Sequence, residues 1–588
     1  MRKQLEDQYN ALMQYFNIDK GVVKNTINKI IKESLHEFVS NCNIPAIWCY
    51  GKHTKMLMAD FIFEMKGIRF IIDEAYSGNK DSGFIMIDQS QIRECGIDGI
   101  IISSFKYREE IKAILRSKFS GVKYLDLYDV LENNEIFLVK EYYESIHPYG
   151  RYMLINEYSR KLQSNISDME KDKIYSKLVR EYVGIKDFRN AIIFEEARSR
   201  QCGIKSEIIG RLRGIYEQLQ SAAAKISGKN VLMLCIDGLR RQDALGGQMK
   251  KIKQWLEDNT FVFLNAYSVS TSTYESLIPA YSGNMDLRTR YFESNIVGEE
   301  QCDFIQTAIE QGRKIHFYTD SCAYIDSKKI VVTDCAQTAT EKLWDFILDS
   351  VEEENGLYYM HILYESHYSY ANPYTETKLI ADGSSIMFDF LSRNGEMLRA
   401  DYDIQHRDAL RYLDDVLYPL LVQMKIRLAL FADHGNMILK QNTRLSDITY
   451  IQNTFHEDLI RIPLVVKSPE MGVGCHKSII SLMEMNNIII SLLKRRKYVP
   501  EEQDFIKIVR SEIYNPDFRY LYKKIKHERG LMAFEGFIFQ TGYKLIVYPD
   551  GKSVLYETEH EQIIDDDHLK NKLLDKVRDF VTVTDMPA

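Results

Sequence analysis

Runs of consecutive hydrophobic residues recur along the chain, and longer segments with helical spacing separate them. In the C-terminal two thirds these runs are residues 231–237, 314–320, 356–363, 428–435 and 462–468. Short apolar runs without alternating polar residues are typical of strands that are buried on both faces of a parallel sheet. Because helical segments lie between the runs, the pattern predicts a large doubly wound α/β domain.

The same alternation occurs on a smaller scale near the N-terminus, where residues 46–50, 70–73 and 99–104 predict a smaller parallel sheet. Gly51 follows the first run and Asp73 ends the second. An acid about 20 residues beyond such a loop is where dinucleotide-binding folds hold a ribose. The region resembles a Rossmann-like domain of the sugar-nucleotide or methyltransferase-associated kind. The resemblance implies a nucleotide or sugar-nucleotide site at Gly51 and Asp73.

Composition and charge narrow the range of functions. Hydrophobic residues make up 45% of the 588 residues, which is enough for folded domains, and the net charge of −8 argues against a nucleic-acid partner. No apolar run approaches the roughly 20 residues of a membrane-spanning helix, and the N-terminus lacks a signal-peptide pattern. The nine cysteines form no CxxC pair, which is typical of reduced thiols. We therefore expect a cytoplasmic protein without an integral membrane segment.

Acidic and imidazole side chains follow several of the predicted strands of the larger domain. Asp237 ends the first run, Asp433 and His434 end another, His367 follows the 356–363 run, and His456 precedes the last. Ligands bind beyond the carboxyl ends of strands in open α/β sheets, so these residues are the first candidates for a site. Two carboxylates and one imidazole suit Zn²⁺, with Mn²⁺ as the alternative.

A hydroxyl-rich segment, residues 270–283, leads into a predicted helix and contains Thr273. A hydroxyl at a helix N-terminus faces the positive end of the helix dipole, which also attracts a phosphate. A metal on the hydroxyl lowers its pKa and provides an activated nucleophile. Helix capping is the competing explanation for Thr273 and for Asp237. Thr271 and Ser272 compete with Thr273 as the nucleophile, and we expect His361 to be a core residue.

Taken together, these motifs resemble the alkaline phosphatase superfamily, specifically its sulfatase-like branch. The motifs that carry the resemblance are Asp237 in LCIDGLR, Thr273 with Ser276 and Gly283 at the family's spacing, Asp433–His434 in FADHGN, His367 in ESHYSYANPY, and His456 before RIPLVVKSP. The pattern is most similar to phosphoethanolamine and phosphoglycerol transferases. The resemblance covers about residues 228–588 and implies that Asp237, Thr273, Asp433 and His434 bind a metal. It also implies that His367 and His456 bind phosphate or protonate the leaving group.

The resemblance also divides the chain. We expect an N-terminal helical segment (1–40), a Rossmann-like domain (41–132), a helical spacer (133–227), a sulfatase-like catalytic domain (228–500) and its C-terminal subdomain with a small antiparallel sheet (501–588).

The nucleophile position departs from that of true sulfatases. Thr273 stands where sulfatases carry a Cys or Ser that is converted to formylglycine, and Leu277 stands in the place of their arginine. We therefore predict a metal-dependent phosphotransferase or phosphodiesterase that acts on a small-molecule or glycan phosphoester. Its setting would be surface-polysaccharide or activated-sugar metabolism. A sulfate-ester hydrolase without formylglycine and a non-catalytic scaffold are the alternatives. The sequence leaves open the substrate and acceptor, hydrolysis versus transfer, the number of metals and the oligomeric state.

Overall fold

The computed structural model describes the chain in two compact units. The smaller unit comprises Met13–Ile166, and the larger comprises Met1–Leu12, Ser167–Thr375 and the described residues from 395 onward. The description leaves out residues 17, 19, 62, 75–76, 79, 82–83, 105–106, 135, 137–147, 288–295, 320–323, 335–336, 368–369, 376–394, 437–454, 513–531 and 584–588.

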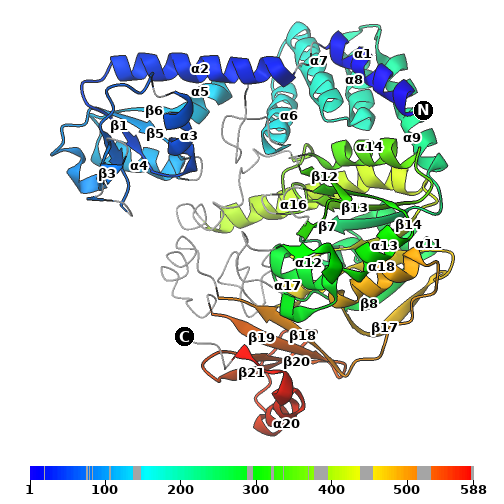
Figure 1. Ribbon diagram of the computed structural model, residues 1–588. Coiled ribbons are helices and arrows are strands. Elements are labelled where there is room, and N and C mark those ends of the chain that lie inside the picture. The colour runs from blue at the N-terminus through cyan, green and yellow to red at the C-terminus, as the bar shows by residue number, and fades with distance from the viewer. Residues whose placement is uncertain are drawn as a thin grey trace. The chain divides into compact units, whose positions relative to one another are not determined.

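The smaller unit is built on a mostly parallel sheet with the strand order β3-β4-β2-β1-β5-β6 (Figure 1). The edge strand β3 is antiparallel to β4, and the other described neighbours are parallel. Its elements are α2 (Lys20–Ser40), β1 (Pro45–Trp48), α3 (Lys52–Asp60), β2 (Phe70–Ile72), β3 (Lys80–Asp81), β4 (Phe84–Ile87), β5 (Gly99–Ile102), α4 (Arg108–Lys118), β6 (Lys123–Asp126), α5 (Leu127–Asn133) and α6 (Pro148–Leu162).

The core of this unit follows from the short apolar strands. Ala46 and Trp48 of β1 pack with Ile100 and Ile102 of β5, and the amphipathic helix α4 covers them with Ile111. Alternate residues of the strands serve this face, as the two-residue period of a strand requires. The predicted small parallel sheet is present, and its assignment as a Rossmann-like nucleotide-binding domain stays a prediction.

The larger unit is built on a nine-stranded sheet with the order β12-β10-β13-β7-β14-β16-β8-β15, in which β17 pairs with β8. The five strands from β12 to β14 are parallel, whereas β16 is antiparallel to β14 and β8. Its strands are β7 (Val231–Ile236), β8 (Phe261–Tyr267), β10 (Lys314–Thr319), β12 (Ile330–Asp334), β13 (Gly356–Ile362), β14 (Arg427–Phe431), β15 (Arg461–Ile462), β16 (Leu464–Lys467) and β17 (Gly474–Ser481).

Helices cover both faces of this sheet (Figure 1). One layer contains α12 (Thr273–Ser282), α13 (Asp303–Glu310) and α18 (Met485–Leu493), and the other contains α9 (Ile209–Lys225), α11 (Lys250–Asn259), α14 (Ala339–Ser350) and α16 (Gly395–Leu421). The unit also contains α1 (Arg2–Tyr15, up to Leu12), α7 (Asp168–Gly184), α8 (Phe188–Cys202), α10 (Arg241–Leu245) and α17 (Glu457–Ile460). The predicted doubly wound fold class is confirmed.

A small antiparallel sheet follows in the same unit. It has the order β18-β19-β20-β21, with β18 (Phe505–Arg510), β19 (Phe534–Phe539), β20 (Tyr543–Val547) and β21 (Ser553–Glu557), and α20 (Asp567–Val577) follows it. Leu573 and Val577 of the helix pack on Phe537 and Leu545 of the sheet. The antiparallel strands and terminal helix predicted for the tail are therefore present, and β18 is an additional strand.

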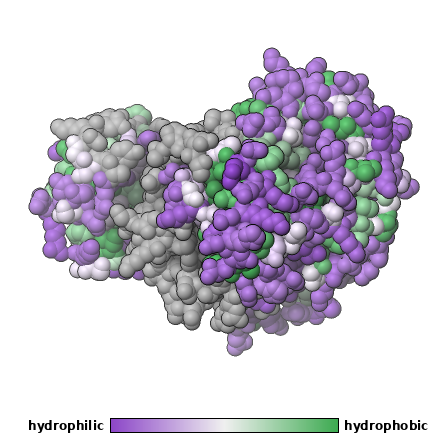
Figure 2. Space-filling model, turned by 90° about the horizontal axis from the view of Figure 1, so that it is seen from below, coloured by the Kyte–Doolittle hydropathy of each residue, from purple (hydrophilic) through white to green (hydrophobic). Residues whose placement is uncertain are grey.

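Hydrophilic side chains cover most of the described surface on the face in Figure 2, and hydrophobic ones form small separate groups. Among the described helices, none combines the length and the hydropathy that a membrane crossing requires. The described cysteines are free thiols.

Candidate metal centre and nucleophile

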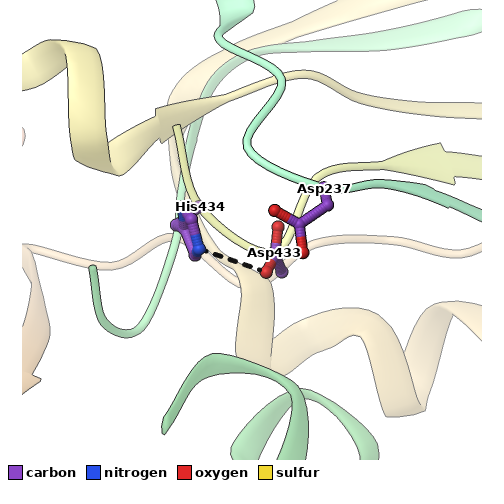
Figure 3. Close-up of side chains that lie close together, drawn as sticks. All are labelled: Asp237, Asp433 and His434. Atoms are coloured by element: carbon purple, nitrogen blue, oxygen red, sulfur yellow. Dashed lines mark ion pairs between the residues drawn. The ribbon is translucent and has the colours of Figure 1, made fainter. Parts of the chain in front are cut away.

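Two neighbouring parallel strands place the candidate metal ligands. Asp237 directly follows β7, and Asp433 and His434 follow β14, which pairs with β7 in parallel register. The carboxyl ends of parallel strands meet at one edge of the sheet, so the three side chains point toward one another (Figure 3). They are buried, and each offers a ligand atom within 4.8 Å of those of the others. The structure thus brings the three predicted side chains together, and their binding of a metal stays a prediction.

Glycines and a buried amide shape the two loops. Gly238 has φ of +64°, a conformation that glycine adopts without strain, and its N–H donates to Asp433 Oδ1 at 3.0 Å. Asn436 donates to the carbonyls of Gly238 and Ser366, both at 2.9 Å. A Cβ at Gly238 would lie 2.2 Å from Asn436 Nδ2. These hydrogen bonds therefore hold the loops that carry Asp237 and Asp433 against each other.

The carboxylates keep lone pairs that no side chain or backbone group uses. Asp237 Oδ1 and Asp433 Oδ2 are buried and have no hydrogen-bond partner among the described residues. Burial raises the pKa of Asp237, but the nearby imidazoles of His367, His361 and His434, when they are protonated, outweigh burial and lower that pKa well below its usual value. A buried anion of this kind needs a cation.

The position of the proton on His434 follows from its second nitrogen. Nδ1 lies 2.7 Å from the carbonyl oxygen of Gly435, an acceptor, so Nδ1 carries the proton and donates. The lone pair of a neutral imidazole is then on Nε2, which lies 3.4 Å from Asp433 Oδ2. A backbone carbonyl on one nitrogen that orients the other toward a metal is the usual arrangement of histidine ligands.

Thr273 is the first residue of α12, and its hydroxyl borders the same group. Thr273 Oγ1 lies 3.2 Å from Asp237 Oδ2 and 3.3 Å from His434 Nε2. The competing hydroxyls lie elsewhere: Ser272 Oγ contacts Glu275 at 3.3 Å, and the buried Thr271 Oγ1 has no hydrogen-bond partner among the described residues. The geometry favours Thr273 over its two neighbours.

The residues at the family spacing from Thr273 support the backbone. Ser276 is buried, and its hydroxyl lies 2.9 Å from that of Ser268, which in turn donates to the carbonyl of Asp433 at 2.5 Å. Gly283 ends the helix with φ of +67°, the left-handed conformation of a C-terminal cap. Neither residue offers a group to the metal-ligand cluster; they fix α12 against the Asp433 loop.

His456 carries its proton on the opposite nitrogen from His434. The backbone N–H of Asp458 donates to His456 Nδ1 at 3.1 Å, so Nδ1 is the acceptor and Nε2 bears the proton. His456 is buried at the start of α17. The N–H of Gly435 donates to the carbonyl of Leu459 at 2.8 Å, which holds this turn beside the Asp433–His434 loop. The tautomer makes His456 a hydrogen-bond donor.

The other two histidines come from β13 and the loop after it. His361 was expected in the core, and it is fully buried, but its Nε2 lies 3.2 Å from Asp237 Oδ2. His367 is half-buried, and its field lowers the pKa of Asp237. His361 is in register with Cys235, two residues before Asp237, so both side chains lie on one face of the sheet. The contact between His361 and Asp237 could not be predicted from the sequence, because the sequence does not reveal which strands pair.

Gly51 and Asp73 belong to the smaller unit and are not part of this group. They follow the adjacent strands β1 and β2, and the N–H of Tyr50 donates to Asp73 Oδ2 at 2.8 Å. Asp73 thus stabilises the loop before Gly51. The nucleotide site at these residues stays a prediction.

The donor set fits a divalent metal. Ligands of a tetrahedral ion at about 2.0–2.2 Å lie about 3.3–3.6 Å from one another. The distances Thr273 Oγ1–His434 Nε2, 3.3 Å, and His434 Nε2–Asp433 Oδ2, 3.4 Å, fall in this range, and Thr273 Oγ1–Asp237 Oδ2 is 3.2 Å. Oxygen donors with one imidazole suit Zn²⁺ or Mn²⁺.

Several solved structures are similar to the chain. A phosphonate monoester hydrolase from Silicibacter pomeroyi has a TM-score of 0.46 and 11% identity over 60% of this chain and 96% of its own. A 2-O GAG sulfatase has a TM-score of 0.44 and 12% identity, and the match covers 60% of this chain and 91% of the sulfatase. The zinc complex of the C-terminal periplasmic domain of EcEptC from Escherichia coli has a TM-score of 0.33 and 15% identity. This match covers 45% of this chain and 82% of that domain.

No protein-family model and no curated relative matches the chain. The similar structures include sulfatases, phosphonate monoester hydrolases and the C-terminal periplasmic domain of EcEptC.

Proposed function

We propose that the chain is a metal-dependent phosphotransferase or phosphodiesterase in which Thr273 is the nucleophile. The observation that carries the proposal is the placement of the Thr273 hydroxyl, 3.2 Å from Asp237 Oδ2 and 3.3 Å from His434 Nε2, at the N-terminus of a helix. A capping hydroxyl would bond to the backbone of its own helix. Thr273 instead faces a carboxylate and an imidazole from two different strands.

Each residue then has a distinct task. Asp237, Asp433, His434 and Thr273 would hold the divalent ion, which, when bound, lowers the pKa of the hydroxyl and neutralises charge on the phosphoryl oxygens. Thr273 Oγ1 attacks phosphorus, and the bond from phosphorus to the leaving oxygen breaks. The proton of Thr273 passes to Asp237 Oδ2, the carboxylate oxygen 3.2 Å from Thr273 Oγ1. Water or an acceptor hydroxyl then releases the phosphoryl group from Thr273.

The leaving oxygen needs a proton, and the tautomer of His456 suits this role. Because Asp458 N–H occupies Nδ1, the Nε2 proton of His456 is the one that can be donated. We assign His456 to the leaving group and His367 to a phosphoryl oxygen. A glycan or other small-molecule phosphoester as substrate, a role in surface-polysaccharide or activated-sugar metabolism and a cytoplasmic location belong to the same proposal and stay predictions.

Metal analysis and a substrate panel test the proposal together. The purified chain should contain one or more equivalents of zinc or manganese after dialysis. The metal-loaded chain should cleave a p-nitrophenyl phosphodiester or phosphomonoester faster than p-nitrophenyl sulfate, because Thr273 cannot become formylglycine. Faster cleavage of the sulfate would favour the sulfatase alternative. A chain that holds no stoichiometric metal and cleaves none of the three would be a scaffold.

A further inference from the structure

An arginine from the small antiparallel sheet contacts the residues on both sides of Thr273. Arg510 is the last residue of β18, and its Nη1 lies 2.9 Å from Ser272 Oγ, 3.2 Å from Tyr274 Oη and 2.5 Å from Glu275 Oε2, so its two N–H groups are shared among three oxygens. The guanidinium also lies over the Tyr274 ring, 5.9 Å from its centroid. One planar group therefore contacts the residue before Thr273 and the two residues after it.

The contact is buried and charged on both sides. Glu275 is fully buried and Arg510 is 5% exposed. Burial lowers the pKa of Arg510, but the Glu275 carboxylate outweighs burial and raises it above its usual value, so the guanidinium stays charged. Ion pairs in such surroundings are weak evidence for stability but hold a fixed geometry, because removing one partner leaves a buried charge. Arginine serves this purpose better than lysine, because its planar guanidinium is pre-organised, whereas the ammonium of lysine lies at the end of a flexible stem.

The backbone around the ion pair is tied to the same place. The N–H of Ser511 donates to Glu275 Oε1 at 3.0 Å, and the N–H of Val509 donates to the carbonyl of Val269 at 2.9 Å. Ser270 Oγ donates to Glu275 Oε2 at 2.9 Å. The end of β18 thus fastens the loop that leads from β8 to the nucleophile.

Ser272 contacts Arg510 and Glu275 in place of making a helix-capping hydrogen bond. It is the N-cap residue of α12 and has the extended backbone of a cap, yet its side chain makes no capping hydrogen bond. Its hydroxyl instead accepts from Arg510 and contacts Glu275. The serine gives up the capping bond and joins the contact with the small sheet.

We propose that Arg510 is a positioning residue for the nucleophile: through Ser272, Tyr274 and Glu275 it fixes the first turn of α12 so that the Thr273 hydroxyl meets Asp237 and His434. The inference rests on the proposed function. It gives the small C-terminal sheet a task in the reaction, because that sheet sets the angle from which Thr273 attacks. A misplacement of about 1 Å can cost roughly 100-fold in rate.

Arg510→Lys tests the inference, because it keeps a cation beside Glu275 but replaces the rigid guanidinium, which contacts Ser272, Tyr274 and Glu275 together, with an ammonium on a flexible stem. We expect kcat for a p-nitrophenyl phosphodiester to fall by about tenfold or more while KM and zinc content stay within about twofold of wild type. Acid-quenched single turnovers should show slower labelling of the Thr273 peptide. Tyr274→Phe removes only one of the three contacts and should lower kcat by about two- to threefold.

Lys507→Met provides the matched control. Lys507 lies on the same strand and pairs with the fully buried Glu535 at 2.7 Å, away from α12. Its loss should lower the melting temperature at least as much as Arg510→Lys does and leave kcat unchanged. If Arg510→Lys does not fold, the charge-neutral pair Glu275→Gln with Arg510→Gln replaces it, with the same fall in kcat expected.

The outcomes separate the two proposals. An active wild type whose kcat survives Arg510→Lys, or falls equally in Lys507→Met, would overturn the positioning role and leave the proposed function standing. A metal-loaded wild type that cleaves none of the esters would overturn both.

Discussion

Acidic residues follow parallel strands in both units, yet the two sites differ in what neutralises them. In the smaller unit Glu109, Asp126 and Asp129 lie within ligand distance of one another, as Asp237, Asp433 and His434 do in the larger unit. The buried Lys112 fills the first group: its Nζ lies 3.0 Å from Glu109 and 2.7 Å from both aspartates. In the second group the described ion-pair partners of Asp237 and Asp433 are the histidines His361 and His434 rather than a lysine.

The position of an acid at a strand end is therefore not enough to identify a metal site. Asp126 also caps α5, because its Oδ1 accepts from the N–H of Tyr128 at 2.9 Å. Asp126 therefore has the structural role that was the competing explanation for Asp237. A carboxylate with a lysine and a cap is satisfied by the protein itself, whereas a buried carboxylate with open lone pairs requires an external cation.

The largest effect should follow removal of one open carboxylate. Asp433→Asn should abolish stoichiometric metal binding and lower phosphodiester turnover by roughly 10³-fold or more, because Asn carries no charge to hold the ion. Metal analysis and steady-state kinetics measure both. Metal at 100 times its Kd should stabilise the wild type by about 2.7 kcal/mol. The variant should lose this gain in a thermal melt.

Asp126→Asn is the matched control for that experiment, since it makes the same change at a strand end that is already neutralised. We expect unchanged metal content and unchanged kcat. If the two variants lost metal and turnover equally, the distinction between open and filled groups would be wrong.

The second effect should be confined to turnover. Thr273→Ala should reduce kcat by several orders of magnitude while the two aspartates and His434 still bind metal in part. Mass spectrometry of acid-quenched wild type should find a phosphorylated peptide that contains Thr273. A phosphate on Thr271, or normal turnover in the variant, would move the nucleophile.

The sequence predicted those parts that depend on local pattern. Continuous apolar runs predicted β7, β13 and β14, and the acids after them marked the edge of the sheet. The run of β8 was missed, because Phe261–Tyr267 includes Asn265 and lies in a segment that reads as mixed. Partners that are distant in sequence could not be predicted either. Arg510 reaches Glu275 across 235 residues.

The protonation states of the histidines were also beyond the sequence. The tautomers of His434 and His456 depend on the carbonyl of Gly435 and the N–H of Asp458, and neither backbone orientation follows from residue type. The same holds for His361, whose contact with Asp237 depends on strand register. Propensity and motif spacing locate candidate residues, and tertiary contacts decide what each one does.

A smaller effect should follow removal of the donor on His456. His456→Ala should lower kcat by about 10²–10⁴-fold for an ester with a poor leaving group, which needs a proton, and much less for one that releases p-nitrophenolate. Comparing an alkyl and a p-nitrophenyl diester measures the difference. Equal losses for both esters, or loss of metal, would contradict the donor role and place His456 among the ligands.

The smallest effect on turnover should come from emptying the filled group of the smaller unit. Lys112→Met removes the buried ammonium from Glu109, Asp126 and Asp129 and leaves Arg108, 3.9 Å from Glu109 and 4.0 Å from Asp129, beside them. Breaking a buried ion pair commonly costs about 3–5 kcal/mol. The smaller unit should melt earlier, while kcat stays at the wild-type value because Asp237, Asp433 and His434 lie in the other unit. Three carboxylates form a site that suits Ca²⁺, so millimolar calcium should restore part of the lost stability in the variant and none in the wild type. Calorimetry with and without calcium measures this difference. A wild type that already gains stability from calcium at this group would show that Lys112 does not fill it, and the contrast between the two units would fail.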